Sequence, residues 1–419
     1  MGRVVVADSS RRSTRVVGIA RHGRLKRSNP YVNVLKLVAV GLTVALVSTA
    51  SVAAIAVSSF SQKVDDNAID IGVGQTNAPA PQLGSYRDGF NILMVGVDND
   101  AAQGAAYGER DATLNDVNIL VHVSADHTNA VVVSIPRDLI VAHPECTDAE
   151  TEETFDAMSA RPINEAMSRG GLPCVVQTVS ELTGLDIPYA GVITFSGVVE
   201  MSDAVGGVPI CLSAPINDPD AGLNLPEGPS IVAGENALAF LRSREGVGDR
   251  SDLARISSQQ MYMASLMRTV KSNGTLTNIP TLINLANAAA TNIRLSTNLA
   301  DIDTMVSMAL ALKDINLDRL LFVQYPGTTD DPDFPNKVVP IQDVADELFA
   351  KLAADEPFAL PEATAGTPTV EPLPPATDEP APETPNETAA PAPETSAQPL
   401  DGLAGQTAQD ESCAQAFTG

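Results

Sequence analysis

Charged side chains stand at the ends of predicted β-strands in this sequence of 419 residues. The stretch "VVVSIPRDL" (131–139) is apolar and β-branched until a proline is followed by Arg137 and Asp138. Asp98 closes "NILMVGVD", and Asp116 stands at the start of the strand in "TLNDVNILVHV". Because ligands of α/β sheets tend to bind at strand ends, these charges are candidates for one site. The alternative for Arg137 and Asp138 is an exposed ion pair, which contributes little to stability.

A second charged cluster lies in "AFLRSREGVGDRSDLARISSQQ" (239–260), which leads into a predicted amphipathic helix. Its candidate residues are Arg242, Arg244, Arg250, Asp252, Arg255, Gln259 and Gln260. Arg255 and Gln259 are i,i+4 neighbours on that helix, so both can face one ligand. Arginine clamps phosphate bidentately, and carboxylates beside it suit a divalent cation that bridges phosphate oxygens. Solvated ion pairs are the alternative, but so many arginines in an acidic domain favour a phosphate site.

Alternating strands and helices must position these residues. Six β-branched runs predict strands: "FNILMVGVD", "VNILVHVS", "AVVVSIP", "YAGVITF", "GVPICL" and "RLLFVQYP". Between them, "PINEAMSRGG", "PCVVQTVSELTG" and "FSGVVEMSDAVGG" have apolar residues at helical spacing and end in glycine. The alternation predicts an α/β fold, a three-layer α/β/α sandwich with a central mixed sheet.

An uncharged apolar segment precedes this domain. Residues 37–60 carry no charge and are long enough to cross a hydrocarbon core of about 30 Å, so we predict one transmembrane helix within residues 31–60. A cleavable signal peptide is the alternative, but the apolar run exceeds an ordinary signal core. Residues 1–30 form a basic tail, which the positive-inside rule places in the cytoplasm. We therefore expect a single-pass protein of the cell membrane whose C-terminal domain is extracytoplasmic.

Composition divides the rest of the chain. Residues 61–88 are polar and predict a linker, and residues 89–355 hold the folded domain. Residues 356–400 are a Pro, Ala, Thr and Glu mixture without Lys or Arg, which predicts disorder. Residues 401–419 form a C-terminal extension, either an extra strand or a free end. With 26 basic against 52 acidic residues, the acidic exterior argues against nucleic acid as a partner.

The four cysteines favour disulfides, because they lie in a compartment where disulfides persist. Cys146 with Cys174 is the more plausible pair, since both flank one loop and helix, and Cys211 with Cys413 is what remains. The sequence alone does not fix this connectivity. No zinc spacing, serine-hydrolase elbow or phosphate-binding P-loop occurs.

The ordered motifs resemble the LytR-CpsA-Psr family, in the form common among mycolic-acid-type actinobacteria. The resemblance covers "NILMVGVD", "LNDVNILVHVSADHTNAVVVSIPRDL", "INEAMSRGGLPCVVQTVSELTGLDI" and "FLRSREGVGDRSDLARISSQQ", which span the folded domain. It implies an extracytoplasmic phosphotransferase that moves a glycopolymer from a polyprenyl-pyrophosphate carrier to peptidoglycan, at the 6-hydroxyl of N-acetylmuramic acid, with Mg²⁺ or Mn²⁺. Arabinogalactan is the expected polymer if the host is an actinobacterium.

The resemblance also implies roles for individual residues. Asp98 and Asp116 would bind the metal, and the pyrophosphate would be held by Arg137, Arg242, Arg244 and Arg255, with Gln259 and Gln260 in the same pocket. Asp138 and Asp252 would order the arginines. The residues expected at the reacting atoms are Asp116, Arg137, Asp138 and Arg255, and either Asp116 or Asp138 would accept the proton of the acceptor hydroxyl.

Two departures and two alternatives remain open. Leu114 stands where many members have arginine, for which Arg110 could substitute, and Ser258 stands in place of a second arginine. A polyprenyl-pyrophosphate pyrophosphatase would use the same residues with water as acceptor. A non-catalytic, wall-associated regulatory or binding module is the alternative from another class.

Overall fold

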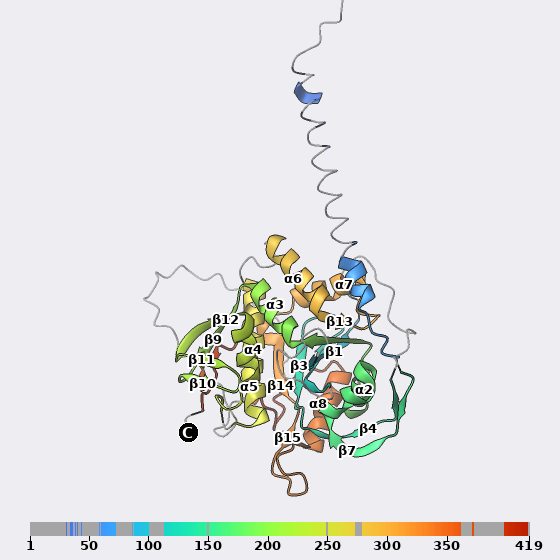
Figure 1. Ribbon diagram of the computed structural model, residues 1–419, viewed down its shortest axis with the longest axis vertical. Helices are drawn as coiled ribbons and strands as arrows, with labels where there is room; N and C mark the ends of the chain where they lie inside the picture. Colours follow the sequence, from blue (N-terminus) through green and yellow to red (C-terminus); the bar gives the residue numbers. More distant parts are fainter. Residues whose placement is uncertain are drawn as a thin grey trace, which may run out of the picture. The chain divides into compact units, whose positions relative to one another are not determined.

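The computed structural model describes most of the chain beyond residue 58. The described residues are 58, 60–72, 86, 88–99, 113–148, 151–248, 250–272, 279–361, 371–372 and 398–417, together with 31, 34–36, 38, 40 and 43. The chain divides into two units, residues 1–57 and 58–419, and the second holds the elements of Figure 1 considered below. The predicted basic tail and most of the predicted transmembrane helix lie outside the described residues, within which no helix is both long and apolar enough to cross a membrane.

A seven-stranded mixed sheet forms the centre of the second unit, in the order β13-β8-β1-β2-β3-β14-β18. β1 (Phe90–Val97), β2 (Asn115–Val123) and β3 (Ala130–Ile135) are antiparallel neighbours. β8 (Tyr189–Thr194) runs parallel to β1, and β14 (Leu320–Gln324) runs parallel to β3. β13 (Ile293–Leu295) and β18 (Gly405–Thr407) add antiparallel edges. The mixed sheet confirms this part of the predicted fold.

Apolar side chains from the two faces of the sheet enter two separate cores. Along β3, Val131 and Val133 enter one core while Ala130 and Val132 enter the other, as the two-residue period of a strand requires. The first core includes residues of α2 (Ala166–Thr183) and α8 (Gln342–Ala353). The second includes residues of α5 (Asp252–Ser272) and α7 (Ile302–Lys313). Helices therefore cover both faces, as in the predicted three layers.

A smaller module carries the second charged cluster. β9 (Val208–Leu212), which the sequence predicted as a strand, pairs with β12 (Gly228–Val232) outside the central sheet. β10 (Ile216–Asp218) pairs with β11 (Leu223–Leu225), and α3 (Phe195–Val205) and α4 (Gly234–Arg242) accompany them. The four strands and α4 share a third core with Met261 and Tyr262 in the middle of α5 and with Ala414 and Ala416 near the end of the chain.

The remaining elements are short or peripheral. They are β4 (Ile140–His143) with β7 (Met158–Pro162), β5 (Cys146–Thr147) with β6 (Thr154–Phe155), β15 (Gly327–Thr328) with β16 (Val339–Pro340), the 3-10 helices η1 (Ile163–Glu165) and η2 (Leu317–Arg319), and α6 (Ile279–Asn292).

The C-terminal extension is part of the folded unit. β18 pairs with β14 at the edge of the sheet, and β19 (Ser412–Cys413) pairs with β17 (Glu371–Pro372). The sequence left a strand or a free end open, and the structure has strands. Disulfides join Cys146 to Cys174 and Cys211 to Cys413, so both expected pairs are confirmed.

Part of the predicted linker also packs on the unit. Residues 60–66 are helical, and Val64 is buried beside Ala290 and Ala300. Ile69 bridges Ser296, and Ile71 enters the first core. Residues 61–72, at the start of the predicted linker, therefore pack on the domain. The folded unit begins before residue 89.

Candidate active site

Arg137 follows the end of β3, and its side chain contacts the start of β2. It follows β3 in a turn closed by a hydrogen bond from the Leu139 N–H to the Pro136 carbonyl. Its guanidinium Nη1 lies 2.6 Å from Asp116 Oδ1 on β2. The Arg137 side chain is 20% exposed and that of Asp116 13%, so water screens this ion pair only partly. The alternative of an exposed ion pair formed by Arg137 and Asp138 alone is therefore wrong, because Arg137 also contacts Asp116.

Asp138 holds Arg137 from the other side. Its Oδ2 lies 3.5 Å from Arg137 Nε, and its Oδ1 accepts a hydrogen bond of 2.6 Å from Lys337 Nζ. Burial raises the pKa of Asp138, but the hydrogen bond from Lys337 and the charges of Arg137 and Lys337 outweigh burial and lower it. The Val338 N–H donates to the Asp138 carbonyl, which fixes the segment carrying Lys337. Asp138 therefore remains ionised at neutral pH and is a weak base.

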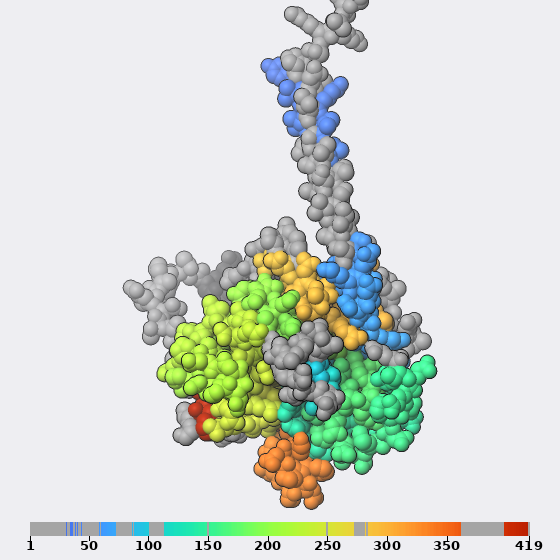
Figure 2. Space-filling view, in the orientation of Figure 1, coloured from blue at the N-terminus to red at the C-terminus, as the bar shows by residue number. Residues whose placement is uncertain are grey.

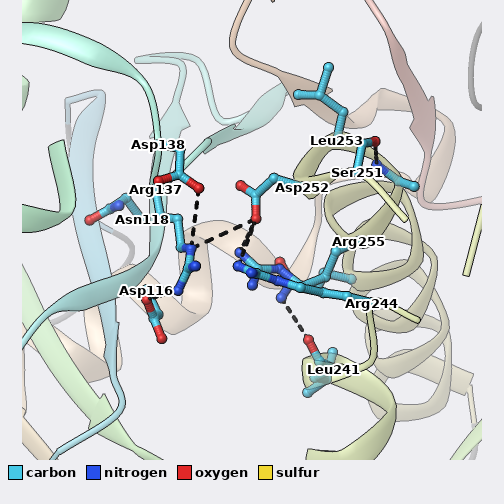
Figure 3. A network of polar contacts seen from close by, with 12 residues as sticks. Asp116, Asn118, Arg137, Asp138, Leu241, Arg244, Ser251, Asp252, Leu253 and Arg255 are labelled. Carbon is cyan, nitrogen blue, oxygen red and sulfur yellow. Dashed lines mark hydrogen bonds and ion pairs between the residues drawn. The ribbon is translucent and has the colours of Figure 1, made fainter. Parts of the chain in front are cut away.

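Asp252 gathers three arginines at the first turn of α5 (Figure 3). Its Oδ1 lies 2.6 Å from Arg255 Nη2, 3.2 Å from Arg244 Nη2 and 4.0 Å from Arg137 Nε. The positive end of the helix dipole also stabilises a carboxylate here. One acid whose side chain is 11% exposed thus connects the strand-end charges to the second cluster, two groups that the sequence had placed in one site.

The network has more cations than carboxylates. The cations are Arg137, Arg244, Arg255 and Lys337, and the carboxylates are Asp116, Asp138 and Asp252, so the net charge of these seven groups is one positive unit. Repulsion among neighbouring guanidinium groups is therefore only partly neutralised. An anion bound among them would complete the neutralisation.

Burial and neighbours shift the arginine pKa values in opposite directions. Burial lowers the pKa of Arg255, and although Asp252 raises it, Arg244 and Arg137 lower it further, to about 10. Burial lowers the pKa of Arg137 too, but Asp116, Asp138 and Asp252 outweigh burial and raise it. Arg255 Nε and Asp252 Oδ2 are buried without a hydrogen bond among the described residues. Since buried polar atoms are normally paired, both atoms are available to a ligand or to water.

The two predicted glutamines attach α5 to its neighbours. Gln259 Nε2 donates to the Leu241 carbonyl at 2.9 Å, which links α5 to α4. Gln260 Nε2 donates to Ser134 Oγ of β3 at 3.4 Å and is 4% exposed. Ser258 is buried and bonds within the helix to the Ala254 carbonyl. In this arrangement the glutamines position the helix that carries Asp252 and Arg255.

Arg242 and Arg250 have contacts with other groups. The Arg242 guanidinium carbon lies 4.8 Å from the ring centroid of Phe195 at the start of α3. Arg250 Nε lies 3.2 Å from Glu245 Oε2. The structure therefore brings Arg244 and Arg255 directly onto Asp252, and it places Arg242 on an aromatic ring.

Asp98 directly follows the last residue of β1, and Asp116 is the second residue of β2, so both lie at the same end of this antiparallel pair. Val97 is opposite Asn115 in the register, and Asp98 Oδ1 accepts a hydrogen bond of 3.4 Å from the Leu114 N–H. Asp98 is 3% exposed. Oxygen ligands of this kind suit Mg²⁺ or Mn²⁺, but no group of three or more metal-binding side chains occurs among the described residues. Mg²⁺ commonly takes one or two carboxylates plus substrate phosphates, and the pair fits that pattern.

Sequence reasoning missed three supporting residues. Lys337 is a lone lysine 199 residues beyond Asp138, and no motif or periodicity marks it. Asn115 and Asn118 are buried, and Asn115 Nδ2 donates to Asn118 Oδ1 at 2.7 Å and to the Ile163 carbonyl. Two asparagines inside an apolar strand were the available signal for this contact between β2 and η1. Arg110, the suggested substitute at Leu114, lies outside the described residues.

The sequence model of the LytR_cpsA_psr family matches residues 47–352. The chain belongs to this family. It is 30% identical to the cell wall biosynthesis protein LcpA of Corynebacterium glutamicum over 309 residues. This match covers 67% of this chain and 59% of LcpA. The chain thus spans less than two thirds of that relative. It is 22% identical to the polyisoprenyl-teichoic acid–peptidoglycan teichoic acid transferase TagT of Bacillus subtilis, over 73% of this chain and 90% of TagT.

Solved structures with a similar fold include two proteins. Protein gbs0355 from Streptococcus agalactiae superposes with a TM-score of 0.51 at 21% identity, over 64% of this chain and 88% of that one. TagT bound to LI-WTA superposes with a TM-score of 0.50 at 18% identity, over 68% of this chain and 98% of that one. At these identities the likeness concerns the fold alone. In this chain the network around Asp252 reaches the ends of β2 and β3 through Arg137 and Asp116.

Proposed function

We propose that this chain is a glycopolymer phosphotransferase of cell wall assembly, which moves a polymer from a polyprenyl-pyrophosphate carrier to peptidoglycan. The observation that carries the proposal is the net positive network of Arg137, Arg244 and Arg255 around Asp252. Family membership and the names of LcpA and TagT support the same class of reaction. The finer assignments proposed are arabinogalactan as polymer and the 6-hydroxyl of N-acetylmuramic acid as acceptor.

In the proposed reaction the arginines hold the pyrophosphate of the donor. The acceptor hydroxyl oxygen attacks the phosphorus nearest the polymer, a new P–O bond forms, and the P–O bond to polyprenyl phosphate breaks. Charge develops on the bridging and equatorial oxygens, and fixed guanidinium groups stabilise that charge without reorganisation. Asp252 and Asp138 keep Arg255 and Arg137 in place before the donor arrives.

Asp116 is the better of the two candidate bases. The lowered pKa of Asp138 and its contact with Lys337 make this carboxylate a poor proton acceptor. Asp116 is held by Arg137, and a pyrophosphate that binds Arg137 would compete for the same N–H groups. Donor binding would then release Asp116 to accept the proton of the attacking hydroxyl.

The metal proposed for this site is Mg²⁺, with Mn²⁺ as a substitute. Asp98 and Asp116 would hold it together with phosphate oxygens of the donor. When bound, such a cation neutralises charge on the phosphoryl oxygens. The arginines would add positive charge for the same oxygens.

The proposed location follows from the sequence. A single membrane helix within residues 31–60 would leave the basic tail in the cytoplasm and the catalytic domain outside, where donor and peptidoglycan meet. The pyrophosphate linkage of the donor supplies the driving force, so the reaction needs no nucleotide.

The test uses the full chain in detergent with Mg²⁺, a short polyprenyl-pyrophosphate-linked sugar, and a peptidoglycan oligomer. Arg137→Ala removes the central arginine, and Arg161→Ala is the matched control because that arginine is 57% exposed on β7. Sugar phosphate should appear on the oligomer with wild type and Arg161→Ala, and not with Arg137→Ala. Release of free sugar phosphate alone would favour a pyrophosphatase, and donor binding without turnover would favour a binding module.

A further inference from the structure

The loop that carries Arg244 is fixed at its start by a buried acid. The described residues between α4 and α5, which are 243–248, 250 and 251, are named here the arginine loop, and this loop brings Arg244 to Asp252. Asp218 of β10 is 1% exposed and accepts hydrogen bonds from Ser243 Oγ at 2.7 Å and from the Arg244 N–H at 3.2 Å. Burial raises the pKa of Asp218, but these and other hydrogen bonds outweigh burial and lower it. The backbone of Arg244 is therefore held by an ionised carboxylate.

The end of the chain fixes the middle of the same loop. Residues 412–417, named here the C-terminal strap, lie beside it. The Gly248 N–H donates to the Gln415 carbonyl at 2.9 Å, and the Phe417 N–H donates to the Gly246 carbonyl at 3.0 Å. Val247 forms an antiparallel bridge with residue 416 and is fully buried. In Figure 2 the red C-terminal residues lie against the yellow-green module that contains this loop.

An aromatic contact closes the strap onto the loop. The Arg250 guanidinium carbon lies 3.7 Å from the ring centroid of Phe417, a cation–π distance. Arg250 has a φ of 68°, in the left-handed region that residues with a side chain seldom occupy. A hydrogen bond from the Arg250 N–H to the Val247 carbonyl holds this turn from within the loop, and Phe417 contacts it from outside.

The strap is itself anchored to β9. The Cys211–Cys413 disulfide joins them covalently. The Ala414 N–H donates to the Cys211 carbonyl at 2.8 Å, the Ser213 N–H donates to the Ala414 carbonyl at 3.0 Å, and the Ala416 N–H donates to Ser213 Oγ at 3.2 Å. The strap thus lies as an extra strand between β9 and the arginine loop.

We propose that the C-terminal strap is a positioning element of the pyrophosphate site. This inference rests on the proposed function, because it assigns the strap to the anion that the arginines would bind. The Arg244 side chain is 35% exposed, so packing alone does not fix it, and its position depends on the backbone of the loop. Phe417 and Arg250 are positioning residues: they act on Arg244 through the loop and need not touch the donor.

The experiment compares binding of inorganic pyrophosphate with Mg²⁺ to the full chain and to three variants. One variant ends after Cys413, which keeps the disulfide and removes the contacts to the loop. Phe417→Leu removes the ring, and Phe417→Tyr is the matched control that keeps it. We expect the truncated chain and Phe417→Leu to bind about tenfold more weakly, because small displacements of a positioning group are costly. Hydrogen exchange at Val247 and Gly248 should accelerate in both, while Phe417→Tyr behaves as wild type.

Thermal unfolding separates positioning from general stability. The two Phe417 variants should unfold at the same temperature and differ in pyrophosphate binding and in exchange of the arginine loop. Unchanged binding in both the truncated chain and Phe417→Leu would overturn the inference, as would equal losses in Phe417→Leu and Phe417→Tyr. If the wild type and the strap variants transfer polymer at the same rate, the inference about the strap is wrong and the proposed function stands. If the strap variants lose pyrophosphate binding but the wild type transfers no polymer, the proposed function is wrong and the inference about the strap stands.

Discussion

Arg137 Nη1 lies 2.6 Å from Asp116 Oδ1, although the two residues are 21 positions apart in sequence. Asp116 lies near the start of β2 and Arg137 just beyond the end of β3, and antiparallel pairing brings Asn118 opposite Ile135. The chain therefore returns Arg137 to the level of Asp116, so that the acid proposed as the base contacts an arginine proposed to bind pyrophosphate.

Arg137→Lys should lower kcat/KM for polymer transfer by about 100-fold. Lysine keeps the charge but lacks the planar fork that contacts Asp116 and phosphate together, and removal of a preorganised donor has this order of effect. Steady-state transfer assays on the full chain measure it. A change of less than threefold would contradict a bidentate role, and Arg161→Lys should have no effect.

Asp138 should make the fold sensitive to acid. Its pKa in the fold lies below the ordinary 3.8, so its ion pairs stabilise the fold above that value and are lost as the pH falls through the lower folded pKa. The free energy of unfolding should therefore decrease below about pH 4. Urea titrations of Asp138→Asn should show a smaller decrease, with exposed Asp318→Asn as control. Identical profiles for wild type and Asp138→Asn would contradict this origin.

Arg255 should make pyrophosphate binding decline at alkaline pH. Its pKa is lowered to about 10, so the guanidinium loses its charge as the pH rises through that value. At pH values between this lowered pKa and the ordinary pKa of arginine, residue 255 is protonated more fully in the unfolded chain than in the fold. Its contribution to the free energy of unfolding therefore rises with pH in that range. Calorimetry from pH 8 upward should show weaker binding near pH 10 in wild type. Arg255→Met should bind weakly throughout and lack this step.

Removal of divalent cations should abolish transfer, and Mg²⁺ or Mn²⁺ should restore it. Asp98→Asn should raise the Mg²⁺ concentration that gives half-maximal rate, because one carboxylate charge is lost at the proposed ligand pair. Metal titrations of transfer after chelation measure this. Full activity in chelator would contradict the proposed metal role of Asp98 and Asp116.

Much of the fold was predictable because the signals are local. The β-branched runs became β1, β2, β3, β8, β9 and β14, and the charges at their ends marked Asp116 and Arg137. Asp252 and Arg255 were predictable because they stand at one helix start. The sequence left the C-terminal extension open between an extra strand and a free end, because β18 is a three-residue edge strand, "GQT", that is ordered by pairing with β14.

Long-range contacts account for what the sequence did not show. Lys337 reaches Asp138 only because its segment pairs with the turn after β3, a relationship with no local pattern. Arg242 and Arg244 are the same residue type two positions apart, so the sequence does not show which of them contacts Asp252. The end of α4 directs one toward Phe195 and the loop directs the other to Asp252.

The central claim is tested most directly by following the phosphorus nearest the sugar. A donor labelled at that phosphorus is incubated with the full chain, Mg²⁺ and a peptidoglycan oligomer, and the products are separated by mass. The proposed reaction predicts the label on the oligomer, in a bond to sugar, with unlabelled polyprenyl phosphate released. Label found only in free sugar phosphate, or only in unreacted donor, would contradict it.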